Sequence, residues 1–253
     1  AAGNNGNNIV NVLGALGQPL NRVTFPGYDR TISVSPGRSY AGVTKDYGVS
    51  GQIDYDFGGA KLTSITAYRE YRSDQGSDTD YSTVDILYRA ADGNSARQFH
   101  TFTQEVRLNG QAFDGKLDWL IGGFYADEDL AVTDNLRFGS QYGRFATCRL
   151  VSGSGLAALY NSAAAGCLAA RPALFGAATP LIYAAIDRLD GINDKGSTVD
   201  RYYQNSRNYA FFTHNIFHVT STVDLTLGVR YTNERKRLNA TFGNDNTACV
   251  ANQ

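Results

Sequence analysis

The stretch YGVSGQIDYDF, residues 47–57, decides the fold class. Its odd positions are aromatic, aliphatic or glycine, and its even positions are polar or glycine. Successive side chains of a strand point to opposite sides of a sheet, so this alternation predicts a β-strand with one apolar and one polar face.

The same period of two recurs along the chain. It is clean over residues 224–234 and recognisable over residues 101–109. Three further runs are rich in Thr, Tyr, Phe and Ile, which favour pleated structure: 61–72, 117–130 and 207–219. All 5 prolines lie outside these runs, as expected for strands that keep their ladder hydrogen bonds. The sequence therefore predicts an all-β fold, an antiparallel meander.

Short and long connections alternate between the predicted strands. The short links are 57–60, 109–116 and 220–223, and the long ones are 73–98 and 131–206. This gives three hairpins, residues 47–72, 99–130 and 207–238. Short turns at one end and long loops at the other are typical of outer-membrane barrels, whose tilted strands need about 9–11 residues to cross the bilayer.

The domain prediction follows from that pattern. Residues 47–253 form a transmembrane β-barrel segment, and residues 1–46 form an extracellular loop. The longest loop, 131–206, contains two Ala- and Leu-rich stretches, 156–170 and 173–189, which predict short helices.

Composition limits the possible partners. The chain carries 23 Lys and Arg against 24 Asp and Glu, without long basic runs, which argues against nucleic acid as a partner. Aromatic residues make up 12%, which argues against disorder. The uncharged stretch 150–170 is too polar and glycine-rich for a membrane-spanning helix. With 0 Met and no leader, we expect an internal piece of a longer chain.

The 3 cysteines are not spaced for a zinc ribbon or a thioredoxin-type site. Cys148 and Cys167 are candidates for a disulfide that closes a loop of about twenty residues, worth about 3 kcal/mol of chain entropy. Cys249 then has no partner in the sequence. The alternative is that all three are free cysteines of a cytosolic protein.

Two motifs suggest chemistry only weakly. Residues 153–158, GSGLAA, fit a dinucleotide-binding turn but lack the hydrophobic strand that should precede them. His214 and His218 would lie about 13 Å apart on a strand, too far for a shared metal, and His100 stands alone. We expect no catalytic residue, no metal site and no cofactor.

Acidic residues cluster twice, at Asp74, Asp78 and Asp80 and at residues 127–129. Calcium binding is the alternative to solvated loop charge, but the helix-loop-helix spacing is missing. Charged residues on the polar strand faces would line a barrel lumen: Asp54, Asp56, Glu105, Arg107, Arg230 and Glu234.

Several hairpin segments resemble the barrel of TonB-dependent outer-membrane receptors. They are TFTQEVRLNG (101–110), LDWLIGGFY (117–125), LTLGVRYT (225–232) and TSITAYR (63–69). The resemblance covers residues 47–240.

The resemblance implies a 22-stranded barrel in the bacterial outer membrane, closed around an N-terminal plug. It also implies uptake of a scarce nutrient such as a siderophore–iron complex, cobalamin or an oligosaccharide, driven by the TonB complex. The partners would be a small-molecule ligand, the lipid bilayer and lipopolysaccharide. Plug, TonB box and terminal aromatic residue are not found in this sequence, and no family ligand-binding residue can be assigned to it.

Three other functions remain open at this point. One is a passive porin or channel, another is a soluble secreted β-sandwich that binds a ligand such as a carbohydrate, and the third is an enzyme built around residues 153–158.

Overall fold

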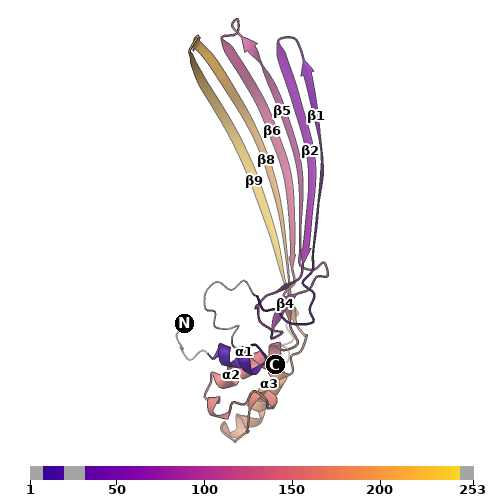
Figure 1. Ribbon diagram of the computed structural model, residues 1–253, viewed down its shortest axis with the longest axis vertical. Coiled ribbons are helices and arrows are strands. Elements are labelled where there is room, and N and C mark those ends of the chain that lie inside the picture. The colour runs from indigo at the N-terminus through magenta and orange to yellow at the C-terminus, as the bar shows by residue number, and fades with distance from the viewer. Residues whose placement is uncertain (1–7, 20–31, 246–253) are drawn as a thin grey trace.

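The computed structural model describes residues 8–19 and 32–245 and contains one nine-stranded antiparallel sheet (Figure 1). Six long strands cross it in chain order, and we call them the wall: β1 (Gly42–Asp56), β2 (Ala60–Gln75), β5 (Ala96–Ala112), β6 (Leu117–Asp134), β8 (Ser197–Thr220) and β9 (Val223–Asp245). The predicted all-β antiparallel meander is confirmed. The sheet is not closed, because within the described ranges β1 pairs only with β2 and β9 only with β8.

Tight turns join the strand pairs at one end of the wall. Between β1 and β2 the amide of Phe57 donates to the carbonyl oxygen of Ala60 at 2.9 Å. Gly58 has a φ of +89°, a left-handed conformation that favours glycine, and its amide donates to the Asp56 carboxylate at 2.7 Å. The turn before β6 lies at residues 113–116, shorter than the predicted link 109–116.

The strands are longer than the sequence pattern predicts. The hairpins span 42–75, 96–134 and 197–245 instead of 47–72, 99–130 and 207–238. The long loops shrink accordingly, to 76–95 and 135–196 instead of 73–98 and 131–206. The added residues lie mostly at the end away from the turns, where polar side chains occupy both faces. The apolar alternation stops there, but the backbone hydrogen bonding continues.

Opposite the turns, the described loops fold into a separate unit that we call the cap: residues 8–19, 32–41, 76–95 and 135–196 (Figure 1). Its helices are α1 (Ile9–Ala15), α2 (Tyr142–Ser152) and α3 (Thr179–Asp190), with 3-10 turns at Ala157–Leu159, Ala165–Cys167 and Gly176–Ala178. Its short strands are β3 (Ser77–Asp78), β4 (Leu87–Arg89) and β7 (Arg137–Phe138). The ladder β3–β4–β7 joins the wall at β8.

The helix predictions were partly wrong. The stretch 173–189 contains α3, but 156–170 forms only 3-10 turns, and α2 lies before it. Gly166 and Cys167 have φ values of +63° and +54°, which no α-helix accommodates. The region 1–46, predicted as a loop, contains α1 and the first residues of β1; residues 1–7 and 20–31 lie outside the described part.

The largest buried apolar cluster of the described residues lies in the cap. It is formed by Val12, Cys148, Val151, Leu156, Cys167, Leu168, Tyr183 and Ile186. A disulfide joins Cys148 on α2 to Cys167 at the centre of this cluster, with a Cα–Cα distance of 5.2 Å. Of the described helices, none has both the length and the apolarity to cross a membrane.

We predict that the disulfide stabilises the cap without affecting the wall. The paired substitution Cys148→Ser and Cys167→Ser should lower the free energy of cap unfolding by about 3 kcal/mol, because the open chain gains entropy when unfolded. Limited proteolysis of the intact protein measures this as faster cleavage within 135–196. Cys249→Ser, which leaves the bond in place, is the control, and equal cleavage of both variants would contradict the prediction.

Candidate functional site

One face of the wall is apolar and exposed. The registers place the odd residues of β1 on the same face as the even residues of β2 and β5 and the odd residues of β6, β8 and β9. Side chains at its middle are far from buried: Val49 71%, Ile53 70%, Phe211 64% and Val229 70%. No second sheet covers this face anywhere in the described chain. We call it the apolar face.

Aromatic residues limit the apolar face on the side toward the cap. One lies on each strand: Tyr47, Tyr68, Phe102, Tyr125, Tyr209 and Tyr231. We call this row the aromatic rim. Neighbouring rings touch in places, with centroids 6.4 Å apart for Phe102–Tyr125 and 6.5 Å apart for Tyr209–Tyr231.

The aromatic rim runs obliquely across the strands. The residues that pair directly with one another across the six strands, starting from Tyr47, end on β9 at Arg237. The rim residue on β9 is Tyr231, six residues (237 − 231) from Arg237 along the strand. Six residues correspond to about 20 Å along a strand, and five interstrand spacings correspond to about 24 Å across the sheet. The rim is therefore inclined by about 40° to the hydrogen-bonding direction.

Polar side chains lie just beyond the aromatic rim. The Tyr47 hydroxyl donates to Glu70 at 2.5 Å, and the Tyr125 hydroxyl donates to Asp127 at 3.2 Å. Asp127 also accepts hydrogen bonds from Asn205 at 2.9 Å and from Arg207 at 3.1 Å. The rim tyrosines thus place their rings among apolar residues and their hydroxyls among polar ones, the arrangement typical of an interface between lipid and water.

The opposite face of the wall is polar, and many of its charges form pairs. On β1 and β2, Asp54 accepts a hydrogen bond from Thr63 at 2.6 Å and lies 3.2 Å from the Lys61 ammonium. Further pairs are Asp46–Arg69, Glu105–Arg107 and Glu234–Lys236. Mixed charges that pair within one face suit a surface in contact with water or with another polar segment. We call this side the polar face.

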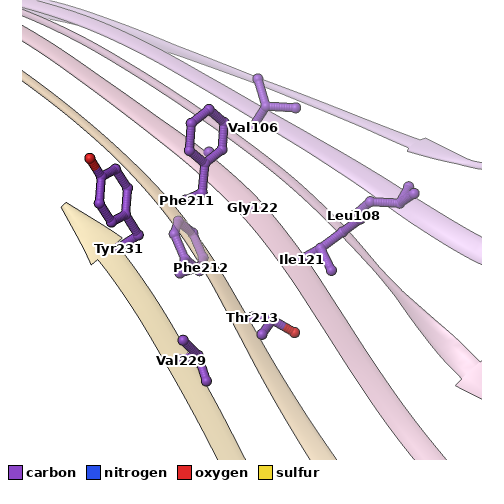
Figure 2. Close-up of a pocket in the computed structure, with 10 residues that line it drawn as sticks. Val106, Leu108, Ile121, Gly122, Phe211, Phe212, Thr213, Val229 and Tyr231 are labelled. Carbon is purple, nitrogen blue, oxygen red and sulfur yellow. The ribbon is translucent and has the colours of Figure 1, made fainter. Parts of the chain in front are cut away.

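Two adjacent glycines of β6, Gly122 and Gly123, lie next to two aromatic rings of β8. Figure 2 shows Gly122 with Phe211 and Phe212. A Cβ on Gly122 would meet the Phe212 ring at 2.4 Å, whereas a Cβ on Gly123 would lie 3.7 Å from Phe211. A shallow hollow of about 590 Å³ lies at these glycines, bordered by Val106 among other apolar residues. Phe212 lies on the polar face, where Arg230 stacks 5.4 Å from its ring centroid.

We predict different costs at these adjacent glycines. Gly122→Ala should destabilise the wall by about 1–3 kcal/mol, because the added methyl group displaces the Phe212 ring. Gly123→Ala is the matched control and should cost clearly less. Denaturant unfolding in detergent measures both, and the double variant Gly122→Ala with Phe212→Ala should lose the extra cost. Equal destabilisation by the two glycine substitutions would contradict this explanation.

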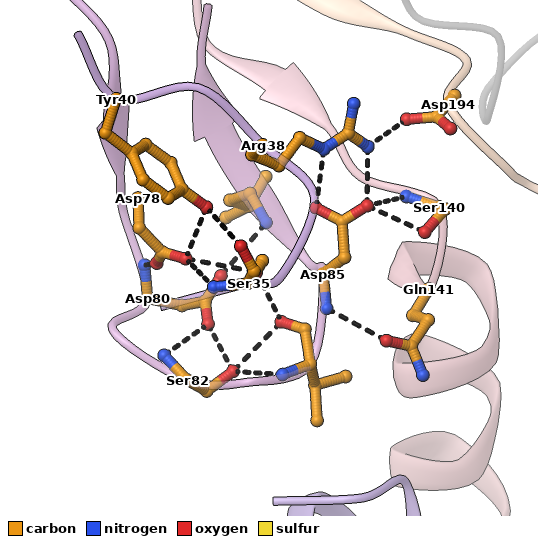
Figure 3. Close-up of polar contacts among 12 residues, drawn as sticks. Ser35, Arg38, Tyr40, Asp78, Asp80, Ser82, Asp85, Ser140, Gln141 and Asp194 are labelled. Atoms are coloured by element: carbon orange, nitrogen blue, oxygen red, sulfur yellow. Dashed lines mark hydrogen bonds and ion pairs between the residues drawn. The ribbon is translucent and has the colours of Figure 1, made fainter. Parts of the chain in front are cut away.

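A segment that precedes β1, residues 32–41, is fastened to the loops of the cap, and we call it the strap (Figure 3). Arg38 donates to both carboxylate oxygens of Asp85, at 3.1 and 2.5 Å, and also pairs with Asp194. Its guanidinium lies 3.8 Å from the ring centroid of Tyr88. Arg38 therefore joins the strap to the loop before β4 and to the connection between α3 and β8.

Two buried carboxylates hold the strap from the other side. Asp85 accepts hydrogen bonds from the Ser140 amide at 2.8 Å and hydroxyl at 2.7 Å, which connects it to the start of α2. Asp78 accepts from the Ser35 amide at 2.8 Å and from the Tyr40 hydroxyl at 3.2 Å. Burial and the nearby Asp78 carboxylate raise the pKa of Tyr40 to about 12.

We predict an acid-sensitive strap. Burial alone would raise the pKa of Asp85, but hydrogen bonds from Arg38 and Ser140 outweigh it and hold that pKa below its ordinary value. Because the pKa of Asp85 is lower in the folded protein than in the unfolded chain, its ionised carboxylate stabilises the fold. This stabilisation is fully present above the unfolded carboxyl pKa of about 4 and is lost as the pH falls through the folded-state pKa. Asp85→Asn should therefore cost about 2 kcal/mol at pH 6, and the gap to wild type should shrink as the pH falls below the ordinary carboxyl pKa of about 4.

Urea unfolding of the cap, followed with a fluorophore on Ser39→Cys in the Cys249→Ser background, measures this gap. Asp114→Asn, in the turn at the far end of the wall, is the control and should show no gap at any pH. A gap for Asp85→Asn that does not change with pH would contradict the assignment.

A polar pocket of about 590 Å³ lies where the polar face meets the cap. The outer ends of β2, β5, β6 and β8 form one side, and Ser77 and Arg89 of the cap form the other. Arg89 donates to both oxygens of Asp134, at 2.5 and 2.9 Å. We call this the mouth pocket. A second, apolar pocket of about 650 Å³ lies within the cap between α3 and the residues that follow α2.

The candidate motifs of the sequence, residues 153–158 and the three histidines, do not come together in one site of the described structure. Residues 153–158 follow helix α2 instead of a strand and lead into a 3-10 turn, so the strand that a dinucleotide site requires is missing there. His214 and His218 both lie on β8, where His218 contacts Asp118 and Asp224 at the turn end. His100 lies on β5 beside Gln98.

The acidic clusters hold structural contacts. Asp78 fastens the strap, and Asp80 accepts hydrogen bonds from the Ser82 amide and hydroxyl. Residues 127–129 lie in β6, so assigning them to a solvated loop was wrong. No group of three or more potential metal ligands is found in the ranges that the structure describes.

Neither a scan of protein-family models nor a search of curated proteins found a match to the chain.

Proposed function

We propose that the chain is part of the barrel of a TonB-dependent outer-membrane receptor that takes up a scarce nutrient, with the apolar face in lipid and the polar face toward the lumen. The observation that carries the proposal is the exposed apolar face with its inclined aromatic rim. Lipid-facing strands of outer-membrane barrels carry such a band between aromatic girdles.

The dimensions of the apolar face support a membrane location. From Tyr47 on β1 to Phe57 in the turn that follows it, the extended chain covers about 33 Å, which corresponds to about 23 Å of depth at a tilt near 45°. The apolar band of such barrels is about 25 Å tall. The aromatic rim would lie level in the membrane if the strands tilted by about 40°, within the range of about 35–45° found in these barrels.

The two edges of the wall support a larger barrel. β1 and β9 each have one side without a strand partner in the described chain. In hydrocarbon, unpaired backbone amide and carbonyl groups cost several kcal/mol each, so a sheet in lipid must close on itself. Further strands of the same barrel would satisfy both edges. The likeness of residues 101–110 and 117–125 to TonB-dependent receptors leads us to place them in a plugged 22-stranded barrel instead of an open channel.

Neighbouring positions on β9 test which face meets lipid. Nitroxide labels on Val229→Cys and Arg230→Cys, in the Cys249→Ser background of the full-length protein in outer-membrane vesicles, lie at the same depth on opposite faces. We predict that oxygen relaxes the label at position 229 more strongly than a water-soluble nickel chelate does, and that this excess is absent at position 230. Nickel access at 229 would place the apolar face in water, and access by neither reagent would place it against a second sheet.

Conductance separates the proposal from a passive channel. The full-length protein in a planar bilayer should show no steady conductance, because a plug closes the barrel of this receptor class. Steady ohmic conductance of the wild-type protein would favour the porin alternative.

A further inference from the structure

The mouth pocket contains two cations, Arg89 and Arg97, but only one carboxylate among its lining residues. Among its lining residues Asp134 is the one carboxylate, and Arg89 already occupies both of its oxygens. The Arg97 side chain extends from β5 on the polar face into the same pocket, where its charge acts on Asp134 from a distance. It forms no direct ion pair or hydrogen bond with any residue that the structure describes. Its guanidinium keeps five donors in a planar fork suited to a carboxylate or another oxyanion.

The rest of the lining is polar and largely neutral. Hydroxyl groups come from Tyr71 and Tyr202 on the wall and from Ser77 on the cap. The side-chain amide of Gln75 has no partner among described residues, and the buried hydroxyl oxygen of Ser95 has none either. A buried polar atom without a partner costs about 1–3 kcal/mol unless water or a ligand satisfies it. The pocket thus offers one fixed positive charge surrounded by hydrogen-bonding groups.

The position of the pocket fits a ligand on its way from the cap to the lumen. It lies on the polar face, at the ends of four wall strands, beneath Ser77 and Arg89 of the cap. Its volume of about 590 Å³ is in the range of small-molecule sites, about 300–1,000 Å³. The apolar pocket of the cap, in contrast, offers nothing to recognise a charge.

We propose that the mouth pocket binds a small anionic, hydroxyl-bearing molecule whose carboxylate, or an equivalent oxyanion, is held by Arg97. Tyr71, Tyr202 and Gln75 then hydrogen-bond its hydroxyl groups. The ligand class rests on the pocket itself, and the role of the ligand as transported cargo rests on the proposed function.

D-gluconate and D-glucitol test the proposal as a matched pair, since they have the same carbon chain and differ in the carboxylate. Titration calorimetry on the full-length protein in detergent should give a dissociation constant of about 1 mM or lower for gluconate and no detectable binding of glucitol. Arg97→Gln should weaken gluconate binding at least tenfold. Arg72→Gln is the control, because Arg72 lies on the opposite face of the wall next to the same row of residues and should leave binding unchanged.

Each outcome bears on the proposal. Gluconate binding that Arg97→Gln leaves intact, equal binding of glucitol, or no gluconate binding at about 10 mM would overturn it. Suppose that gluconate binding depends on Arg97 but the nitroxide label at position 229 is not exposed to lipid. This outcome would support the ligand site and contradict the transport function. If the label at position 229 faces lipid but gluconate does not bind, the transport proposal still holds, and the proposed anionic, hydroxyl-bearing ligand is contradicted.

Discussion

The structure depends on the unbroken backbone hydrogen bonding that joins the six wall strands. Each ladder continues for nearly the whole length of its strands, with one irregularity near His218. Because the strands satisfy each other's polar backbone groups, the sheet does not need a second layer to hold its shape. The side chains are then free to be apolar on one face and polar on the other.

This constraint divides the chain into two parts that are stabilised differently. The cap is a small globular unit with a buried cluster, a disulfide and ion pairs such as Arg144–Asp190 at 2.8 Å. The wall has almost no buried apolar residues of its own, apart from Ala126 and Ala210. In water such a wall would be a large exposed apolar patch, which soluble monomers rarely carry. In the lipid environment that we propose, the same surface would be stabilising.

The sequence predicted the strands correctly where apolar and polar residues alternate with a period of two. Residues 47–57 and 224–234 predict their strands and faces correctly, because each apolar side chain lies on the side that a period of two assigns to it. The same rule misplaces the outer strand ends. β8 begins at Ser197, ten residues before the predicted start, because both faces are polar there and no alternation marks the strand.

The contacts of the cap and of the mouth pocket could not be predicted in this way. Arg38 meets Asp85 and Asp194 across 47 and 156 positions of sequence, and no local pattern relates them. Likewise, Arg97 and Arg89 differ in their contacts, because only Arg89 lies within hydrogen-bonding distance of Asp134. Such roles follow from how the loops fold over the wall, and the sequence shows only that charged residues are present.

The unpartnered sides of β1 and β9 have a practical consequence for laboratory work. Within the described residues, each offers a long row of amide and carbonyl groups without a strand partner, next to apolar side chains, and such an edge readily pairs with the edge of another molecule. Recombinant production of residues 42–245 alone should therefore yield inclusion bodies with intermolecular β-structure. Antibodies or crystallisation chaperones are better raised against the disulfide-linked cap, whose buried cluster joins Val12 of α1 to residues of 135–196 and lies away from the apolar face.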